Sequence, residues 1–349
     1  MKAVVLVGGE GTRLRPLTET VPKPLLPIVN RPLLHRVLDH LAEHGVNEVI
    51  ASSPYLEESF ATFIAERHGD PRITWITERE PLGTGGAIVN ALPRLDGTFL
   101  VLNGDILTDL DLAAMLEFHH RQSAVATISL HRVEDARPFG LVVSETDGRV
   151  LEFREKPVEL VPGDINAGTY VLEPRAIDGW KPDRTISIER EIFPSLIEGG
   201  APVYSHLSDA YWLDLGTPQK YLQAHFDILE GKVAGIRCPA PFRAETATVD
   251  LEARLGRWVV IGEHAVVDAG AEIEDSVVLD AASVGAGARV VESILGPGAV
   301  VEPNATVIGS VLAEGARVKA GAEVEGARIS PGQSAGAVRP GGGLSAETH

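Results

Sequence analysis

Residues 2–15 read KAVVLVGGEGTRLR, an aliphatic, β-branched run followed at once by a glycine-rich loop with two arginines. The run 2–7 is typical of a buried strand in a parallel sheet, and ligands bind at the carboxyl ends of such strands. Glycines let backbone N–H groups approach an anion, and nearby cationic side chains supply charge. The glycines are Gly8, Gly9 and Gly11, and the cations are Arg13, Arg15 and Lys23. The stretch predicts an anion-binding loop after the first strand.

Two familiar phosphate motifs do not fit this loop. A P-loop requires Gly-x-x-x-x-Gly-Lys-Ser/Thr, and a dinucleotide fingerprint requires a third glycine where this chain has Leu14. Pro16 argues against a helix that starts directly after the glycines. Taken alone, the loop is equally consistent with a tight turn whose arginines are solvated.

The composition of the 349-residue chain, with 44% hydrophobic and 23% charged residues, indicates a globular protein long enough for two domains. The net charge of −18 argues against a nucleic-acid partner, because neutralising phosphates requires a basic face. Cys238 is the single cysteine, which excludes an internal disulfide. No apolar run approaches the length of a membrane span and no leader pattern precedes the first strand, so we expect a cytoplasmic protein without a membrane partner.

Short aliphatic strands alternate with amphipathic helices up to about Gly231, which predicts an α/β domain with a mainly parallel sheet. Closer strand spacing after Asp105 predicts an added mixed or antiparallel part. We expect strands near 48–52, 73–77, 99–103, 126–133, 141–144, 150–155 and 169–172, and helices near 32–44, 110–121, 187–197 and 218–230.

A 17-residue repeat begins beyond the proline-rich segment 238–241. Large aliphatic residues recur in three registers: Ile261, Val278, Leu295, Leu312 and Ile329; Val267, Val284, Val301 and Val318; and Ile273, Val290, Val307 and Val324. A small residue stands two positions before nearly every one of them, and residues i and i−2 share a face in extended chain. This pattern predicts a parallel β-helix of about four coils rather than a β-sandwich with chance periodicity.

The glycine loop, followed by Pro22-Lys23-Pro24-Leu25, resembles the signature of sugar-1-phosphate nucleotidyltransferases, and the repeats resemble the hexapeptide repeats of left-handed β-helices. The resemblance implies a Rossmann-like nucleotidyltransferase domain with a mainly parallel mixed sheet and a C-terminal left-handed parallel β-helix. We expect the catalytic domain over 1–235, a linker over 236–249, the β-helix over 250–335 and a flexible tail over 336–349.

Two carboxylates are candidate metal ligands. Asp105 follows the strand 99–103, and Asp214 precedes a helix that begins at Pro218. Alone, they would be a turn residue and a helix cap. The resemblance implies that together they hold Mg²⁺, which proteins bind with one or two carboxylates and substrate phosphates.

Glu78 opens the segment 78–87, which joins a strand to a helix and whose glycines permit a flat base to lie against the backbone. A glycine-rich helix start is the plainer alternative. The resemblance implies that this segment reads the base, in a form similar to guanylyltransferases. An ionised carboxylate only accepts hydrogen bonds, and guanine offers it two adjacent donors, whereas uracil or thymine would oppose it with acceptors.

Further motifs resemble the sugar-phosphate site of the family. Lys156 would meet the sugar phosphate and Glu155 a sugar hydroxyl, and the segment 187–194 resembles mannose-1-phosphate guanylyltransferases. The resemblance assigns catalysis to Arg13, Lys23 and Lys156, nucleotide binding to Leu6, Gly8, Gly9, Gly11, Thr12, Arg13, Glu78, Gly83 and Thr84, and sugar-phosphate binding to Asn103, Gly140, Glu155, Lys156, Asn166 and Gly168.

The resemblance implies that the sugar-1-phosphate oxygen attacks the α-phosphorus of the nucleotide in line and expels pyrophosphate. The favoured substrates are GTP and mannose-1-phosphate, which give GDP-mannose. Alternatives that stay open are manno-heptose- or glucose-1-phosphate, UTP or dTTP, and a non-catalytic subunit that senses nucleotide-sugar. An acyltransferase is disfavoured, because His264 is the single histidine of the repeats. A homo-oligomer assembled through the β-helix is expected.

Overall fold

The computed structural model describes residues 1–54 and 57–337, so residues 338–349 of the predicted tail lie outside the described residues. The chain forms two compact units, one of Met1–Gly9 with Leu34–Trp212 and one of Glu10–Leu33 with the chain from Leu213 onwards. The signature loop therefore divides between the units after Gly9. The predicted domain boundary at residue 235 stays a prediction.

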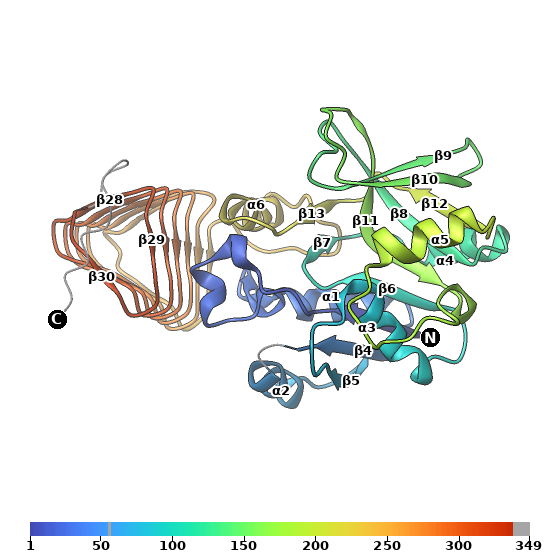
Figure 1. The fold of residues 1–349 in the computed structure, drawn as a ribbon. Coiled ribbons are helices and arrows are strands. Elements are labelled where there is room, and N and C mark those ends of the chain that lie inside the picture. Colours follow the sequence, from blue (N-terminus) through green and yellow to red (C-terminus); the bar gives the residue numbers. More distant parts are fainter. Residues whose placement is uncertain (55–56, 338–349) are drawn as a thin grey trace. The chain divides into compact units, whose positions relative to one another are not determined.

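The first unit contains one mixed sheet with the strand order β10-β9-β11-β6-β1-β4-β5, and β8 and β12 continue the sheet beside β11 (Figure 1). Its strands are β1 (Lys2–Leu6), β4 (Glu48–Ser53), β5 (Arg72–Thr77), β6 (Phe99–Asn103), β8 (Ala126–Val133), β9 (Gly140–Ser144), β10 (Val150–Glu155), β11 (Gly163–Leu172) and β12 (Val203–Leu207). β1 pairs in parallel with both β4 and β6, whereas β11 runs antiparallel to β6. The predicted sheet with an antiparallel addition is confirmed.

Burial on both faces explains why the central strands are continuously aliphatic. Val4 and Val101 are fully buried in the core of the first unit, and so are Ile88 of a covering helix and Phe193. The helices are α1 (Leu33–Glu43), α2 (Glu57–Glu66), α3 (Gly83–Ala91), α4 (Leu112–Arg121) and α5 (Phe193–Glu198), the last preceded by a π-helical turn η6 (Ile188–Ile192). The predicted helices near 32–44, 110–121 and 187–197 are confirmed.

Short turns fill the start of the second unit. Residues 12–14, 17–19 and 23–25 form 3₁₀ turns, and β2 (Pro27–Ile28) and β3 (Arg31–Pro32) form a small hairpin. The absence of an α-helix directly after the glycines agrees with the expectation from Pro16. Beyond β13 (Trp212–Asp214), helix α6 (Pro218–Leu229) begins one residue after Thr217, whose hydroxyl caps it by accepting from the N–H of Lys220.

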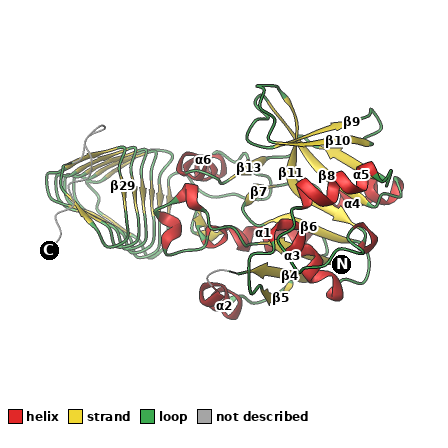
Figure 2. Cartoon of the chain, in the orientation of Figure 1, coloured by secondary structure: helices red, strands yellow, loops and turns green. Residues whose placement is uncertain are grey.

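Three parallel sheets of short strands, with strands stacked coil on coil, make up the rest of the second unit (Figure 2). The first sheet contains β14 (Phe242–Arg243), β17 (Val260–Ile261), β20 (Val277–Val278), β23 (Ile294–Leu295), β26 (Val311–Leu312) and β29 (Arg328–Ile329). The second contains β15 (Thr248–Val249), β18 (Val266–Val267), β21 (Ser283–Val284), β24 (Val300–Val301), β27 (Arg317–Val318) and β30 (Ser334–Ala335). The third contains β16 (Arg254–Leu255), β19 (Glu272–Glu274), β22 (Arg289–Val291), β25 (Thr306–Ile308) and β28 (Glu323–Glu325).

The repeat predicted the interior of this β-helix correctly, because the aliphatic residues of all three registers lie in one buried core. Its start and its number of coils were predicted wrongly. Over residues 242–335 the sheets have six, six and five strands, and β14 and β15 fall inside the predicted linker. The reason is an 18-residue first coil: Val249 pairs with Val267, and Leu255 with Ile273. The handedness of the coils stays a prediction.

A serine ladder accounts for the small residues at one corner of the β-helix. The hydroxyl of Ser276 donates to the carbonyl of Glu274 and accepts from the N–H of Ser293, one coil further on. Ser293 repeats the pattern with Ser310, and Ser310 accepts in turn from the N–H of Ala327. Because a buried N–H group needs a partner, serine replaces alanine at this corner.

Candidate active site

The first unit places Gly8 and Gly9 after β1, at the carboxyl end of the sheet. A Cβ atom on Gly8 would make only an ordinary contact with Pro54, and one on Gly9 would meet no atom within 4 Å. Leu6, the last residue of β1, pairs with Asn103 of β6, so both predicted binding residues lie at the same sheet edge. The open space beside Gly9 leaves its backbone accessible to an anion.

Asp105 follows β6 in a turn that depends on its glycine. The N–H of Gly104 donates to the carbonyl oxygen of Leu6 at 2.9 Å, and a Cβ on Gly104 would lie 2.9 Å from that same oxygen. No side chain fits there, because the obstacle is backbone. The turn brings Asp105 to the carboxyl end of β6, as the sequence predicted.

Glu78 is fixed by hydrogen bonds from its own unit. Its side chain is 7% exposed, Oε1 accepts from the hydroxyl of Ser52 at 2.7 Å, and Oε2 accepts from the N–H of Leu82 at 2.9 Å. Each carboxylate oxygen has a second lone pair, so the group is oriented without being saturated. Base reading by Glu78 stays a prediction.

Gly83 and Thr84 begin α3 beside the π-helical turn η6. Gly83 has φ +72°, and a Cβ on it would lie 2.6 Å from the carbonyl oxygen of Ile186. The Thr84 hydroxyl donates to Oε2 of Glu189 at 2.7 Å and accepts from the N–H of Ile188 at 3.0 Å. π-Helical turns recur at functional sites, and this one aims Glu189 back at the predicted nucleotide segment. Glu189 lies within the motif 187–194, but nothing in the sequence indicates this contact.

The predicted sugar-phosphate residues gather on β9, β10 and β11. Gly140 pairs with Glu155, and a Cβ on Gly140 would lie 2.7 Å from the Phe153 ring and 3.0 Å from Oε2 of Glu155. Lys156 takes a left-handed conformation with φ 53°, and its N–H donates to the carbonyl of Phe139. Burial raises the pKa of Glu155, and the nearby Glu189 carboxylate raises it further.

Asn166 and Gly168 form a second part of this region. Oδ1 of Asn166 accepts from the N–H of Gly168 at 2.9 Å, while its Nδ2 donates to the Tyr170 hydroxyl at 2.8 Å. Gly168 has φ +73°, and a Cβ on it would lie 2.6 Å from Nδ2 of Asn103. The structure therefore brings Asn103, Asn166 and Gly168 together, and only glycine fits between them.

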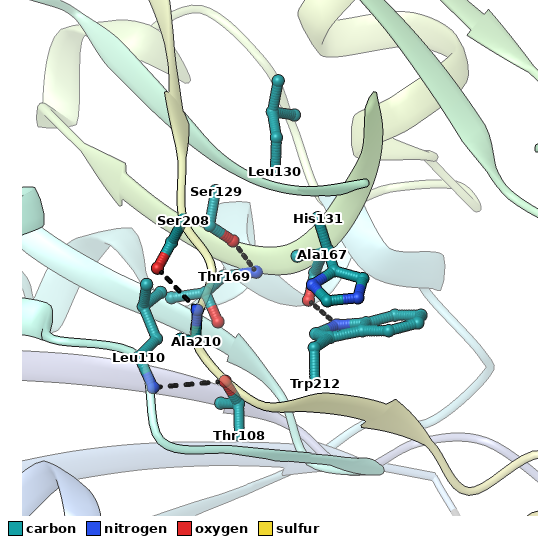
Figure 3. A pocket seen from close by; sticks show the side chains of 10 residues that line it. All are labelled: Thr108, Leu110, Ser129, Leu130, His131, Ala167, Thr169, Ser208, Ala210 and Trp212. Carbon is teal, nitrogen blue, oxygen red and sulfur yellow. Dashed lines mark hydrogen bonds between the residues drawn. The ribbon is translucent and has the colours of Figure 1, made fainter. Parts of the chain in front are cut away.

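Figure 3 shows a small hollow behind this segment, with room for about one water molecule. Nε1 of Trp212 donates to the carbonyl of Ala167 at 2.9 Å, and the His131 ring stacks on the indole at 5.3 Å between centroids (Figure 3). Phe139 meets the same indole edge-on. The hollow is too small for a sugar, so Trp212 acts here by holding the 166–168 segment in place. This role of Trp212 could not be predicted, because no local sequence pattern links Trp212 to Ala167.

One carboxylate in the second unit lies among three cations. Oδ1 of Asp214 is 3.5 Å from Nζ of Lys23, and Oδ2 is 3.7 Å from Nζ of Lys220 and 4.0 Å from Nη2 of Arg13. A Cβ on Gly216 would lie 2.9 Å from both Arg13 Nη2 and Asp214 Oδ2. These four residues form a group that we call the Asp214 cluster, and its three cationic side chains suit an anionic ligand. Lys220 was not predicted, although its place in the first turn of α6 was visible.

Gly11 and Thr18 shape the turn that carries Arg13. Gly11 has φ +62°, its Cβ would lie 3.0 Å from Cγ2 of Thr18, and its carbonyl accepts from the Thr18 hydroxyl at 2.8 Å. Thr12 begins the following 3₁₀ turn, and the Arg13 side chain is 68% exposed. Gly11 is thus the glycine of the loop whose conformation a larger residue would strain.

A divalent metal fits these residues only together with phosphate. Among residues 1–54 and 57–337, no group of three or more histidine, cysteine, aspartate or glutamate side chains is placed to hold a metal ion. Asp105 belongs to the first unit and Asp214 to the second. Asp214 can offer its carboxylate oxygens to a metal, and the surrounding cations would repel a bare ion. Phosphate oxygens would both neutralise the cations and complete the coordination.

Residues 2–231 match the family described as Nucleotidyl transferase, and residues 239–336 match the GMPPB C-terminal domain. The chain belongs to the nucleotidyl transferase family. It is 39% identical over 290 residues to a mannose-1-phosphate guanylyltransferase of Mycobacterium tuberculosis, covering 80% of this chain and 79% of that protein. It is also 33% identical over 257 residues to a UTP–glucose-1-phosphate uridylyltransferase of Synechocystis, covering 68% and 66% of the two chains.

A crystal structure of HddC from Yersinia pseudotuberculosis complexed with GMP-PN shares the fold of part of this chain. The TM-score is 0.57 at 31% identity, over 64% of this chain and 97% of that chain. With the family matches, these similarities identify the chain as a sugar-1-phosphate nucleotidyltransferase. No helix in the described part of the chain combines the length and apolar character of a membrane span.

Proposed function

We propose that the chain transfers a guanylyl group from GTP to mannose-1-phosphate, with Mg²⁺, and releases pyrophosphate. The observation that carries this proposal is the Asp214 cluster, in which Arg13, Lys23 and Lys220 surround one carboxylate. Such a cluster suits a polyphosphate and a metal that arrives with it. Its cations come from the signature loop and from the first turn of α6, Asp214 ends β13, and the chain belongs to the nucleotidyl transferase family.

The residues divide the work of a phosphoryl-type transfer. Arg13 and Lys23 would bind the triphosphate and neutralise the charge that develops on the leaving pyrophosphate. Lys156 would orient the sugar phosphate, whose ionised oxygen is the nucleophile, so no strong base is required. Bound Mg²⁺ would add Lewis-acid polarisation of phosphate oxygens, and the family resemblance assigns Asp105 and Asp214 as its carboxylate ligands.

Guanine is the favoured base for two reasons. Glu78 is held with both oxygens oriented, and a carboxylate matches the adjacent N–H donors of guanine. The relative from Yersinia pseudotuberculosis was crystallised with a guanine nucleotide analogue. Mannose is favoured by the similarity to the Mycobacterium tuberculosis enzyme. The second candidate is UTP with glucose-1-phosphate, which the similarity to the Synechocystis enzyme supports.

A pyrophosphate-release panel tests these assignments. GTP, UTP, dTTP, ATP and CTP are each offered with mannose-, glucose- or manno-heptose-1-phosphate and Mg²⁺. The proposal requires the highest kcat/KM for GTP with mannose-1-phosphate. A preference for another pair would change the assigned substrates but leave the assigned reaction, nucleotidyl transfer, unchanged. If no pair releases pyrophosphate and the chain binds a nucleotide-sugar tightly, the chain is a regulatory subunit and not an enzyme.

A further inference from the structure

One face of the β-helix differs from the other two. In the sheet β14-β17-β20-β23-β26-β29, the aliphatic residues of the register that begins at Ile261 point into the core. The residue before each of them points outward, because successive residues of a strand face opposite sides. These outward residues form one paired column: Val260, Val277, Ile294, Val311 and Arg328. The first three are fully buried and Val311 is 6% exposed. An outward apolar column is buried only where other chain covers it.

The other two faces lack such a column. On the second sheet, Val266 is 37% exposed and Arg317, one coil before Arg328, is exposed. On the third sheet, Glu323 and Arg289 are exposed. The covered face is therefore a special surface of the second unit, which we call the docking face and define by Val260, Val277, Ile294, Val311 and Arg328.

Segments of the same unit contact this side of the β-helix. The Phe226 ring of α6 lies 6.2 Å from the Trp258 ring, and Nδ2 of Asn30 donates to Oε1 of Glu263. At the far end, Nη1 of Arg328 donates to the carbonyl of Arg15 at 2.8 Å and to that of Arg13 at 3.4 Å. The turn that contains Arg13 and Arg15 thus lies beside Arg328, although more than 300 residues separate them in the chain.

Arg328 contacts the backbone of the turn that carries the Arg13 side chain. The amides of Leu14 and Arg15 donate to the carbonyls of Gly11 and Thr12 and close the turn. The carbonyls of Arg13 and Arg15 accept hydrogen bonds from the guanidinium of Arg328. Hydrogen bonds from a charged donor are stronger than neutral ones, and one guanidinium nitrogen bridges two carbonyls. The bridge fixes the backbone on both sides of Leu14 and therefore the direction of the Arg13 side chain.

We propose that Arg328 is a positioning residue, and that the last coil of the β-helix sets the conformation of the turn that presents Arg13 to the nucleotide. The positioning role rests on the proposed function, but the bridge to the turn does not. Arg328 supplies the directional contact between the docking face and the turn.

The first experiment measures amide hydrogen exchange in a peptide covering Arg13 to Leu17, without substrate. Arg328→Met keeps the side-chain length but removes the donors, and exchange of Leu14 and Arg15 should quicken about tenfold, as expected for one charge-assisted hydrogen bond. Arg328→Lys keeps a charged donor and should restore most of the protection. Arg317→Met is the matched control, since Arg317 lies one coil earlier on another sheet and pairs with Glu302, and it should leave exchange unchanged.

The second experiment is steady-state kinetics with the same three variants. Arg328→Met should raise KM for the nucleotide several-fold and leave KM for the sugar phosphate unchanged, with Arg328→Lys in between. Unchanged exchange in Arg328→Met would refute the claim that the hydrogen bonds from Arg328 hold the turn. Faster exchange with an unchanged KM for the nucleotide would refute the positioning role. A wild-type protein that transfers no nucleotide would refute the proposed function, while the exchange result would still decide the bridge.

Discussion

Nζ of Lys23 lies 3.5 Å from Oδ1 of Asp214, and both side chains are largely withdrawn from solvent, with 7% and 16% exposed. Lys23 belongs to the signature loop and Asp214 to the segment before α6, so the pair joins two distant motifs within one unit. Because Lys23 is almost fully buried, its charge needs a counter-charge. The pair thus has a structural role beside its proposed role in binding phosphate and metal.

Replacing Asp214 by asparagine should therefore lower both activity and stability. We expect kcat/KM to fall at least about 100-fold and the free energy of unfolding to fall by about 2 kcal/mol, because the buried Lys23 charge loses the Asp214 counter-charge. Urea denaturation and pyrophosphate release measure the two effects. The double variant Asp214→Asn with Lys23→Met should regain stability but not activity. Full activity in Asp214→Asn would exclude a role in catalysis.

Glu78→Gln should relax base selectivity. Glutamine retains one acceptor oxygen, but its amide nitrogen cannot accept from the N–H of Leu82, so a loss of about 1 kcal/mol in stability accompanies the change. We expect the ratio of kcat/KM for GTP over UTP to fall about tenfold or more. The Ser52→Ala variant, which loses a hydrogen bond to the same carboxylate, controls for stability. An unchanged ratio in Glu78→Gln would remove Glu78 from base recognition.

Glu155 should make the folded state less stable as pH rises. Its pKa is raised above the ordinary value of 4.5, first by burial and then by Glu189, so the folded state holds this proton more tightly than the unfolded state. The contribution of Glu155 is fully present below pH 4.5 and is lost as pH rises through the folded pKa. Denaturation of wild type and Glu155→Gln from pH 4 to 7 should show their stability difference growing toward neutral pH. A constant difference would contradict the raised pKa.

Ser293→Ala should destabilise the β-helix without touching the site residues. The change leaves the buried N–H of Ser310 without its acceptor, at a cost of about 1–3 kcal/mol. Denaturant midpoints measure the loss. Ser283→Ala is the matched control, because Ser283 is the outward residue of β21 and only half-buried, and should change stability by less than about 0.5 kcal/mol. Equal midpoints in the two variants would show that the ladder contributes nothing.

Patterns within short stretches predicted most of the fold. The aliphatic run 2–7 and the repeat beyond Ile261 indicated which residues share a buried face, and periodicity alone carries that information. The first coil was missed because its 18-residue length breaks the repeat at Val249. The π-helical turn at Glu189 was missed because it differs from an α-helix by one residue in hydrogen-bond spacing, which no side-chain pattern records.

By itself, the sequence determined the α/β sheet, the stacked β-helix and the residue types of a phosphate site, because these depend on local spacing and side-chain chemistry. Only the tertiary structure decided which charges meet. It pairs Lys220 with Asp214 and lets the indole N–H of Trp212 donate to the carbonyl of Ala167. It also places the Arg328 guanidinium where it donates to the carbonyls of Arg13 and Arg15. Such contacts join residues far apart in the chain, and their existence follows from how whole elements pack rather than from any motif.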